Sequence, residues 1–228
     1  MEPLTVVPIA RIRSVFPQKF GIPRQSNIID GITSTIVFEP QFRNADALRG
    51  IDQFDFLWLI WNFSANGRDG WSPTVRPPRL GGNQRMGVFA TRSPFRPNGL
   101  GLSSVRLLGV EWQSPEGPRL LVAGADLMDG TPIVDIKPYL PYTDAHPDAR
   151  SGFAPTPASR LLEVRCPDAL LAKVDPALRQ PLLDILAHDP RPSYHNSGQR
   201  EYGMAFGKFN VKFKVLENNV LEVFEIFF

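Results

Sequence analysis

The sequence predicts a mainly β protein, with a closed β-barrel as its N-terminal domain and a small α+β C-terminal domain. The first 136 residues hold six or seven segments rich in β-branched and aromatic residues, separated by Gly and Pro turns. Almost no helix is expected between them. Because a parallel doubly wound sheet needs crossover helices, these strands are expected to close on themselves instead.

The expected strands of the barrel follow one another along the chain. The segment FDFLWLIWNF, residues 54–63, is a near-continuous apolar run of the kind that forms a buried strand. Residues 44–52 are the only segment of this part that suggests a short helix. The full set of expected strands comprises residues 4–12, 32–38, 54–63, 85–91, 102–112, 119–125 and 131–136.

The composition changes after residue 140, which divides the chain into two predicted domains. The barrel is expected over residues 1–140 and the C-terminal domain over residues 160–228. Between them, residues 141–159 hold four prolines together with Asp, Ala and Gly, which is typical of a linker.

Three elements are expected in the C-terminal domain. Residues 160–165 resemble a strand, and residues 176–188 resemble a helix that begins at a proline. Residues 208–216 alternate between apolar and polar side chains, and residues 217–219 (Glu-Asn-Asn) supply a turn. This alternation predicts a hairpin with one buried face.

The charge of the chain is small in total and uneven along the sequence. The net charge is +2, but residues 1–110 carry 13 basic and 7 acidic groups, whereas residues 111–228 carry 12 and 16. The basic residues are 19 Arg and 6 Lys, and no acidic residue lies between Gly70 and Val110. Because arginine binds phosphates and carboxylates in a bidentate manner, this stretch indicates contact with an anion such as RNA. A solvated basic surface without a ligand is the alternative.

Composition and spacing exclude several classes of protein. A chain with 43% hydrophobic residues is not intrinsically disordered, and a single cysteine, Cys166, excludes an internal disulfide framework. The three histidines lack metal-ligand spacing, so no metal site is expected. No apolar run could span a bilayer and the N-terminus does not resemble a secretory signal, so a cytoplasmic protein without membrane contact is expected. The glycines at 99 and 101 lack the helix that a dinucleotide fold requires.

Two further segments carry candidate functional groups. In GADLMDGTPIVDIKPY, Asp126, Asp129 and Asp135 follow one another; Asp129 precedes Gly130 as in an ordinary turn, whereas Asp135 lies in a predicted strand, where Asp is disfavoured. A carboxylate in that position is either functional or paired, with Lys137 as the nearest partner. The segment DPRPSY, residues 189–194, presents an Arg and a Tyr that suit RNA, or it simply ends a helix.

Several segments together resemble one family. They are ARIRS with FGIPRQ, LRGIDQFDFLWLIWNF, WSPTVRPPRLGGNQRMGVFATRSPFRPN, LMDGTPIVDIKPYLPY, DPRPSY and KFNVKF. Over nearly its whole length the chain is similar to the TsaA-like (TrmO) tRNA methyltransferases. The resemblance implies S-adenosylmethionine-dependent methylation at N6 of N6-threonylcarbamoyladenosine, at position 37 beside the anticodon of threonine tRNA. It also implies a homodimer that binds the tRNA anticodon stem-loop.

The resemblance carries functional roles to particular positions. Relatives often have His where this chain has Ser64, so a His base is impossible there. Phosphate contacts are expected from Arg76, Arg79 and Arg96 in the acid-free stretch, and further tRNA contacts from Asp189, Arg191 and Tyr194. The expected cofactor contacts are Pro23, Arg24, Gln25, Ser64, Arg92, Leu102, Asp129, Gly130 and Thr131.

The reaction requires a group that removes a proton from a weakly nucleophilic, urea-like nitrogen. Asp135 is the first candidate for this proton-accepting group, and Asp129 and Tyr139 are the next candidates. Two other classes of function stay open. One is a β-barrel RNA-binding protein without catalysis, and the other is a methyltransferase that acts on a small molecule.

Overall fold

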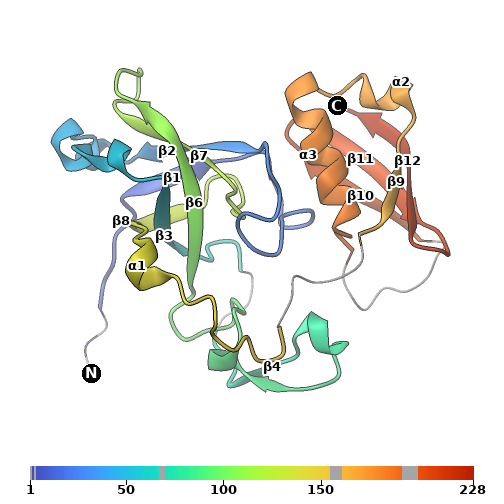
Figure 1. The fold of residues 1–228 in the computed structure, drawn as a ribbon, viewed down its shortest axis with the longest axis horizontal. Helices are drawn as coiled ribbons and strands as arrows, with labels where there is room; N and C mark the ends of the chain where they lie inside the picture. Colours follow the sequence, from blue (N-terminus) through green and yellow to red (C-terminus); the bar gives the residue numbers. More distant parts are fainter. Residues whose placement is uncertain (1, 3, 67–69, 155–160, 192–199) are drawn as a thin grey trace.

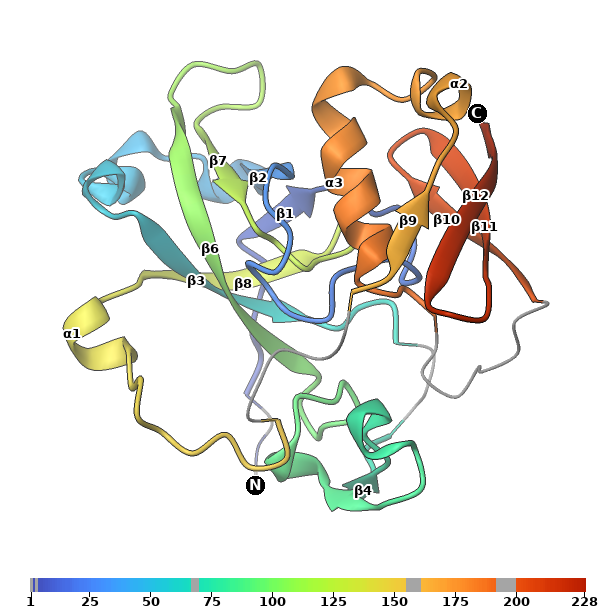
Figure 2. The ribbon, with the colours of Figure 1, turned by 45° about the vertical axis from the view of Figure 1, so that its right-hand side comes forward.

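The computed structural model describes residues 2, 4–66, 70–154, 161–191 and 200–228. Six strands close into a barrel in the order β1-β2-β7-β6-β3-β8, and every neighbouring pair is antiparallel (Figures 1 and 2). The predicted fold class, a barrel followed by a small α+β domain, is confirmed. The strands are β1 (Ala10–Arg13), β2 (Thr33–Phe38), β3 (Phe56–Asn62), β6 (Leu100–Glu111), β7 (Arg119–Ala123) and β8 (Pro132–Pro138).

Strict alternation of side chains fills the barrel. Along β3, Leu57, Leu59 and Trp61 are buried while the residues between them are partly exposed. Because successive side chains of a strand point to opposite faces, the near-continuous apolar run of β3 supplies both the interior and an apolar outer surface. The facing strands contribute Val105 and Ile133, which are fully buried in the same core.

Three local expectations differ from the structure. Strand β1 begins only at Ala10, because Pro8 has no N–H for a strand ladder. In place of a helix over residues 44–52 there are two short 3-10 helices, Ala45–Leu48 and Ile51–Gln53, separated by Gly50 with a positive φ of 83°. Of the strand expected at residues 85–91, only Met86–Gly87 is a strand, and a 3-10 helix over Val88–Ala90 follows it.

Residues 70–98 form a small lobe below the barrel, away from the C-terminal sheet (Figures 1 and 2). A two-stranded ribbon holds the lobe together, in which β4 (Thr74–Val75) pairs with β5 (Met86–Gly87). The 3-10 helices Pro78–Leu80 and Val88–Ala90 complete it. This lobe contains most of the acid-free, arginine-bearing stretch.

The C-terminal part is a four-stranded sheet in the order β10-β11-β12-β9, with helix α3 across one face (Figure 1). The expected hairpin and helix are present, and β9 adds to the edge of the sheet as a parallel strand. Between the two parts, the short helix α1 (Pro141–Asp144) lies at the start of the proline-rich stretch. The elements are β9 (Glu163–Arg165), α2 (Asp168–Leu171), α3 (Pro176–Ala187), β10 (Glu201–Phe206), β11 (Phe209–Val215) and β12 (Val220–Phe227).

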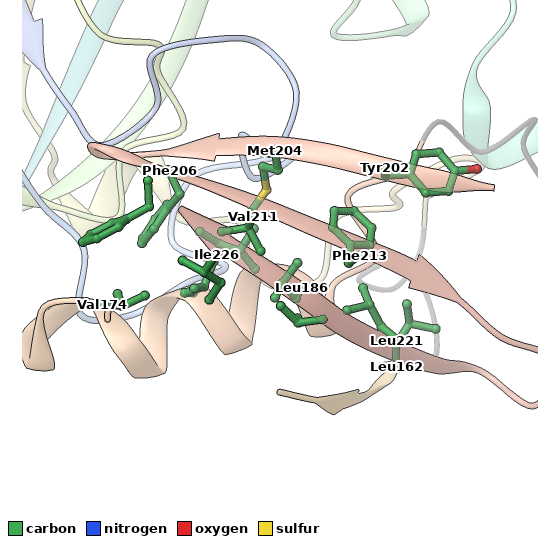
Figure 3. Close-up of a cluster of buried hydrophobic side chains, with 14 of the residues drawn as sticks. Leu162, Val174, Leu186, Tyr202, Met204, Phe206, Val211, Phe213, Leu221 and Ile226 are labelled. Atoms are coloured by element: carbon green, nitrogen blue, oxygen red, sulfur yellow. The ribbon is translucent and has the colours of Figure 1, made fainter. Parts of the chain in front are cut away.

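The inner face of this sheet is wider than α3 alone covers. Figure 3 shows its buried side chains between the strands and the helix. The remainder is covered by residues 14–32, the long connection between β1 and β2 of the barrel. Phe16 is buried against Phe206, and the ring of Phe20 lies parallel to those of Tyr202 and Phe213.

Two contacts hold the first half of this connection against β10 and the turn that follows it. The N–H of Gly207 donates to the carbonyl of Val15 at 2.6 Å. Gly21 has a φ of 95°, and a Cβ there would lie 2.3 Å from the sulfur of Met204, so the strand β10 packs directly against glycine backbone. Residues 14–32 of the barrel domain therefore belong to the hydrophobic core of the C-terminal sheet, whereas the barrel interior forms a second core of its own. No helix in the described part of the chain is long and apolar enough to cross a membrane.

Candidate functional site

A cavity of about 490 Å³ opens where one end of the barrel meets the lobe and the β1–β2 connection. This volume lies within the usual range for a site that binds a small molecule or cofactor. Four stretches far apart in the sequence line it: residues 19–25, residues 58–66, residues 91–103 and residues 126–131.

The side chains of the β1–β2 connection that reach the cavity are tied to both neighbouring parts. Arg92 of the lobe donates a short hydrogen bond to the side-chain oxygen of Gln25. Arg24 donates to the carbonyl of Arg191 in the C-terminal part at 3.4 Å. Gln25 therefore contacts the lobe and Arg24 contacts the C-terminal part. The shape of this wall of the cavity depends on how the lobe and the C-terminal part are placed around the β1–β2 connection.

Aromatic residues at the end of β3 form another wall. The rings of Trp61 and Phe63 meet edge to face, with centroids 4.3 Å apart. Gly101 on β6 is required beside them, because a Cβ at this position would lie 2.3 Å from the ring of Trp61. Such a wall offers apolar contact to a planar ring or to a sulfonium group.

A chain of hydrogen bonds leads from this wall to a carboxylate. The indole N–H of Trp61 donates to Oγ of Ser103 at 3.0 Å, and the Ser103 hydroxyl donates to Oδ1 of Asp126 at 2.6 Å. Burial raises the pKa of Asp126 above its ordinary value, while the bond from Ser103 and the charge of Arg92 partly oppose the shift. A carboxylate with a raised pKa accepts a proton more readily than an exposed one.

The charges around the cavity are strongly asymmetric. Among the described residues that line it, Asp126 alone carries a carboxylate, whereas Lys19, Arg24, Arg92 and Arg96 carry positive charges. Arg96 is held by bonds to the carbonyls of Thr91 and Val88 at 2.7 and 3.4 Å. The site therefore suits a ligand that brings more negative than positive charge.

The structure brings together most of the residues predicted to contact a cofactor. Asp129 and Gly130 do not line the cavity and instead form the turn that fixes the end of β1: the Asp129 carboxylate accepts from the N–H of Ser14 at 2.9 Å. The predicted residues that line the cavity are Pro23, Arg24, Gln25, Ser64, Arg92, Leu102 and Thr131.

The residues predicted to be catalytic lie outside the cavity lining. Asp135 is on the outer face of β8, where its carboxylate is 2.9 Å from the ammonium of Lys137 and both side chains are substantially exposed. Tyr139 packs against Trp58 with a centroid distance of 5.4 Å, and Trp58 does line the cavity. Asp129 supports the turn described above.

The residues predicted to bind tRNA fall into two groups. Arg76 and Arg79 are exposed on the lobe, and Arg96 stands at the cavity. Arg191 forms a two-bond ion pair with Asp189, with both N–O distances at 2.8 Å, so its guanidinium is occupied within its own turn. Tyr194 lies outside the described residues.

Asp126 belongs to the acidic cluster that stands out in the sequence, but it was not among the predicted catalytic residues. The signal was the spacing to Asp129 and Asp135, which marks a cluster without showing which carboxylate faces inward. Its partners Ser103 and Trp61 carried no signal of their own. No group of three His, Cys, Asp or Glu side chains in the described part of the chain could hold a metal ion.

Comparison with known proteins gives consistent matches over the whole length. Residues 11–145 match the tRNA-methyltransferase O N-terminal domain, and residues 160–227 match the TrmO C-terminal domain. The chain is 40% identical to the tRNA (adenine(37)-N6)-methyltransferase of Escherichia coli K12, covering 96% of this chain and 94% of that protein.

Two Pseudomonas aeruginosa matches agree. The chain is 40% identical to a putative S-adenosylmethionine-dependent methyltransferase, RcsF, covering 97% of both chains. A crystal structure of TrmO from the same species superposes with a TM-score of 0.79 at 33% identity, covering 100% of this chain and 99% of that one.

The position of Asp126 predicts a pH dependence of stability. Because its pKa in the native state is raised above the value in the unfolded chain, the native state holds this proton more tightly. Asp126 therefore contributes stability that is complete below the ordinary pKa of aspartate and is lost as the pH rises through the raised pKa. Asp126→Asn removes this titration.

We expect the free energy of unfolding of Asp126→Asn, relative to that of the wild type, to increase with pH across this window. Urea unfolding of both proteins between about pH 4 and about pH 8 measures the difference. A difference that stays constant with pH would contradict the burial of this carboxylate.

Proposed function

The chain belongs to the tRNA-methyltransferase O family of tRNA (adenine(37)-N6)-methyltransferases, and from this premise we propose its substrate and chemistry. The proposed substrate is N6-threonylcarbamoyladenosine at position 37 of threonine tRNA. The methyl donor is S-adenosylmethionine, and the product carries a methyl group on N6. We further propose that the protein acts in the cytoplasm as a homodimer.

One observation carries the proposal: a single, partly buried carboxylate faces a cavity whose other charged side chains are all positive among the described residues. The carboxylate provides a proton acceptor, and the positive groups match the carboxylates of the threonyl group and the methyl donor together with the RNA phosphates. Trp61 and Phe63 offer apolar contact beside them.

The residues present fit S-adenosylmethionine. Its carboxylate matches Arg24 or Arg92, and its adenine and sulfonium group match the aromatic wall of Trp61 and Phe63. Pro23 and Gln25 would hold it from the β1–β2 connection. When bound, S-adenosylmethionine supplies a methyl group that leaves a sulfonium sulfur.

The contribution of the chain to the reaction is orientation and proton transfer. The N6 nitrogen becomes bonded to the methyl carbon and loses its proton, which we assign to the carboxylate of Asp126. Ser103 fixes the direction of this carboxylate, and Trp61 in turn fixes Ser103. Asp135, Asp129 and Tyr139 remain predictions as catalytic residues, and their positions outside the cavity lining give them less support.

Transfer of labelled methyl groups to tRNA tests the substrate directly. We expect methylation of threonine tRNA that carries the threonylcarbamoyl group, and none of the same tRNA without it. Digestion of the product to nucleosides locates the methyl group by mass. Equal labelling of both tRNAs would contradict the proposed substrate, and failure to bind S-adenosylmethionine in calorimetry would contradict the methyl donor and leave an RNA-binding protein.

Substitution of Asp126 tests the proton acceptor. Asn keeps the shape of the side chain and can still accept the bond from Ser103, but it does not take up a proton. We expect Asp126→Asn to lower the rate of single-turnover methylation at saturating cofactor by about 10²- to 10⁴-fold. The affinity for S-adenosylmethionine should change little.

Asp135→Asn is the matched control, because Asp135 pairs with Lys137 on the outer face of the barrel. It should retain most of the wild-type rate. A large loss in Asp135→Asn with near-normal methylation by Asp126→Asn would reverse the assignment and support the interpretation of Asp135 drawn from the sequence.

A further inference from the structure

Two large aromatic side chains stand exposed on the lobe beside the cavity. Trp71 is 52% exposed and Phe89 is 73% exposed. Their rings are nearly parallel, with an interplanar angle of 19° and centroids 6.4 Å apart. Neither ring lines the cavity described above, so the proposed reaction gives them no role.

The backbone of the residue next to each ring is fixed by hydrogen bonds. The N–H of Ser72 donates to the carbonyl of Phe95 at 3.1 Å, and the N–H of Val88 donates to the carbonyl of Pro73 at 3.0 Å. Val88 is buried, and its 3-10 helix directs the next residue, Phe89, to the surface. The rings therefore need little ordering when a ligand binds.

The charged side chains of the lobe, residues 70–98, are all basic. The segment from Gly70 to Val110 contains no acidic residue, and Arg76, Arg79 and Arg85 are exposed on the same lobe. The guanidinium of Arg96 lies 6.0 Å from the centre of the Phe89 ring. Exposed aromatic rings within a positive surface are the combination that binds single-stranded nucleic acid, with rings stacking on bases and cations contacting phosphates.

The rings adjoin the cavity through shared residues. A small hollow is lined by Phe89, Arg96, Pro97, Asn98 and Leu100, of which Arg96 and Leu100 also line the cavity. A nucleotide next to the one that enters the cavity would thus meet the aromatic surface.

We propose that Trp71 and Phe89 form a stacking surface for a nucleobase of the anticodon loop, adjacent to the nucleotide whose base enters the cavity. This inference rests on the proposed function, because it takes RNA as the substrate. In this proposal the two aromatic rings of the lobe recognise an unpaired base of the loop. The exposed arginines of the same lobe bind the phosphates of the RNA backbone.

The probe for the test is a synthetic anticodon stem-loop RNA with 2-aminopurine at the position 3′ to the target adenosine. Phe89→Ala and Trp71→Ala should each weaken its binding by about 5- to 150-fold, because that is the range for loss of one base–aromatic stack. Phe89→Tyr keeps the ring and should bind as the wild type does. The quenching of 2-aminopurine on binding should be lost in the alanine variants.

Trp112→Ala is the matched control, since Trp112 is 44% exposed just beyond the other end of β6. It should leave the RNA affinity unchanged. All variants should bind S-adenosylmethionine as the wild type does, which shows that the cavity is intact.

Wild-type RNA affinity in both alanine variants would overturn the inference. A change of their mass in light scattering with unchanged RNA affinity would also overturn it, because the rings would then contact another protein chain. The readout is RNA affinity and not methylation. If the wild-type protein transfers no methyl group, the proposed function is contradicted. The stacking surface would still be supported if the wild type binds the RNA and both alanine variants bind it more weakly.

Discussion

The packing of residues 14–32 between the barrel and the C-terminal sheet is the constraint on which the site depends. One face of this connection supplies Phe16 and Phe20 to the core of the C-terminal sheet. Its other face presents Arg24 and Gln25 to the cavity. Through this connection, the C-terminal sheet supports this wall of the cavity.

The electrostatics of the molecule follow from the same arrangement. The acid-free stretch is concentrated in the lobe and in β6, so the positive charges meet at one end of the barrel beside the cavity. At the cavity, the Ser103 hydroxyl donates to Asp126, which carries the one carboxylate among the described lining residues. The position of Asp126 at the end of the barrel buries its carboxylate and so raises its pKa. The same end of the barrel gathers the basic side chains that attract anionic groups.

Local patterns in the sequence predicted the features that short-range periodicity determines, namely strands and the hairpin. The alternation of residues 208–216 and the apolar run of β3 indicated the hairpin and the barrel, and seven of the nine cofactor contacts implied by the family resemblance line the cavity. The role of residues 14–32 was not predicted, because its contacts with β10 span almost the whole chain. Asp126 was not selected over Asp135 because strand periodicity alone does not show which carboxylate faces a cavity at the end of a barrel. Asp135 satisfied its charge with Lys137, two residues away on the same face.

Titration calorimetry of S-adenosylmethionine into Met204→Ala tests most directly whether the C-terminal sheet holds the cavity wall. Met204 is buried on β10 against Gly21 and does not line the cavity. Val220 is buried in the same sheet but outside the hydrophobic cluster that contains Met204, so Val220→Ala serves as the control. Weaker binding by Met204→Ala than by Val220→Ala, with both proteins folded at the temperature of the titration, is the predicted result. Equal affinity in Met204→Ala, Val220→Ala and the wild type would contradict the account.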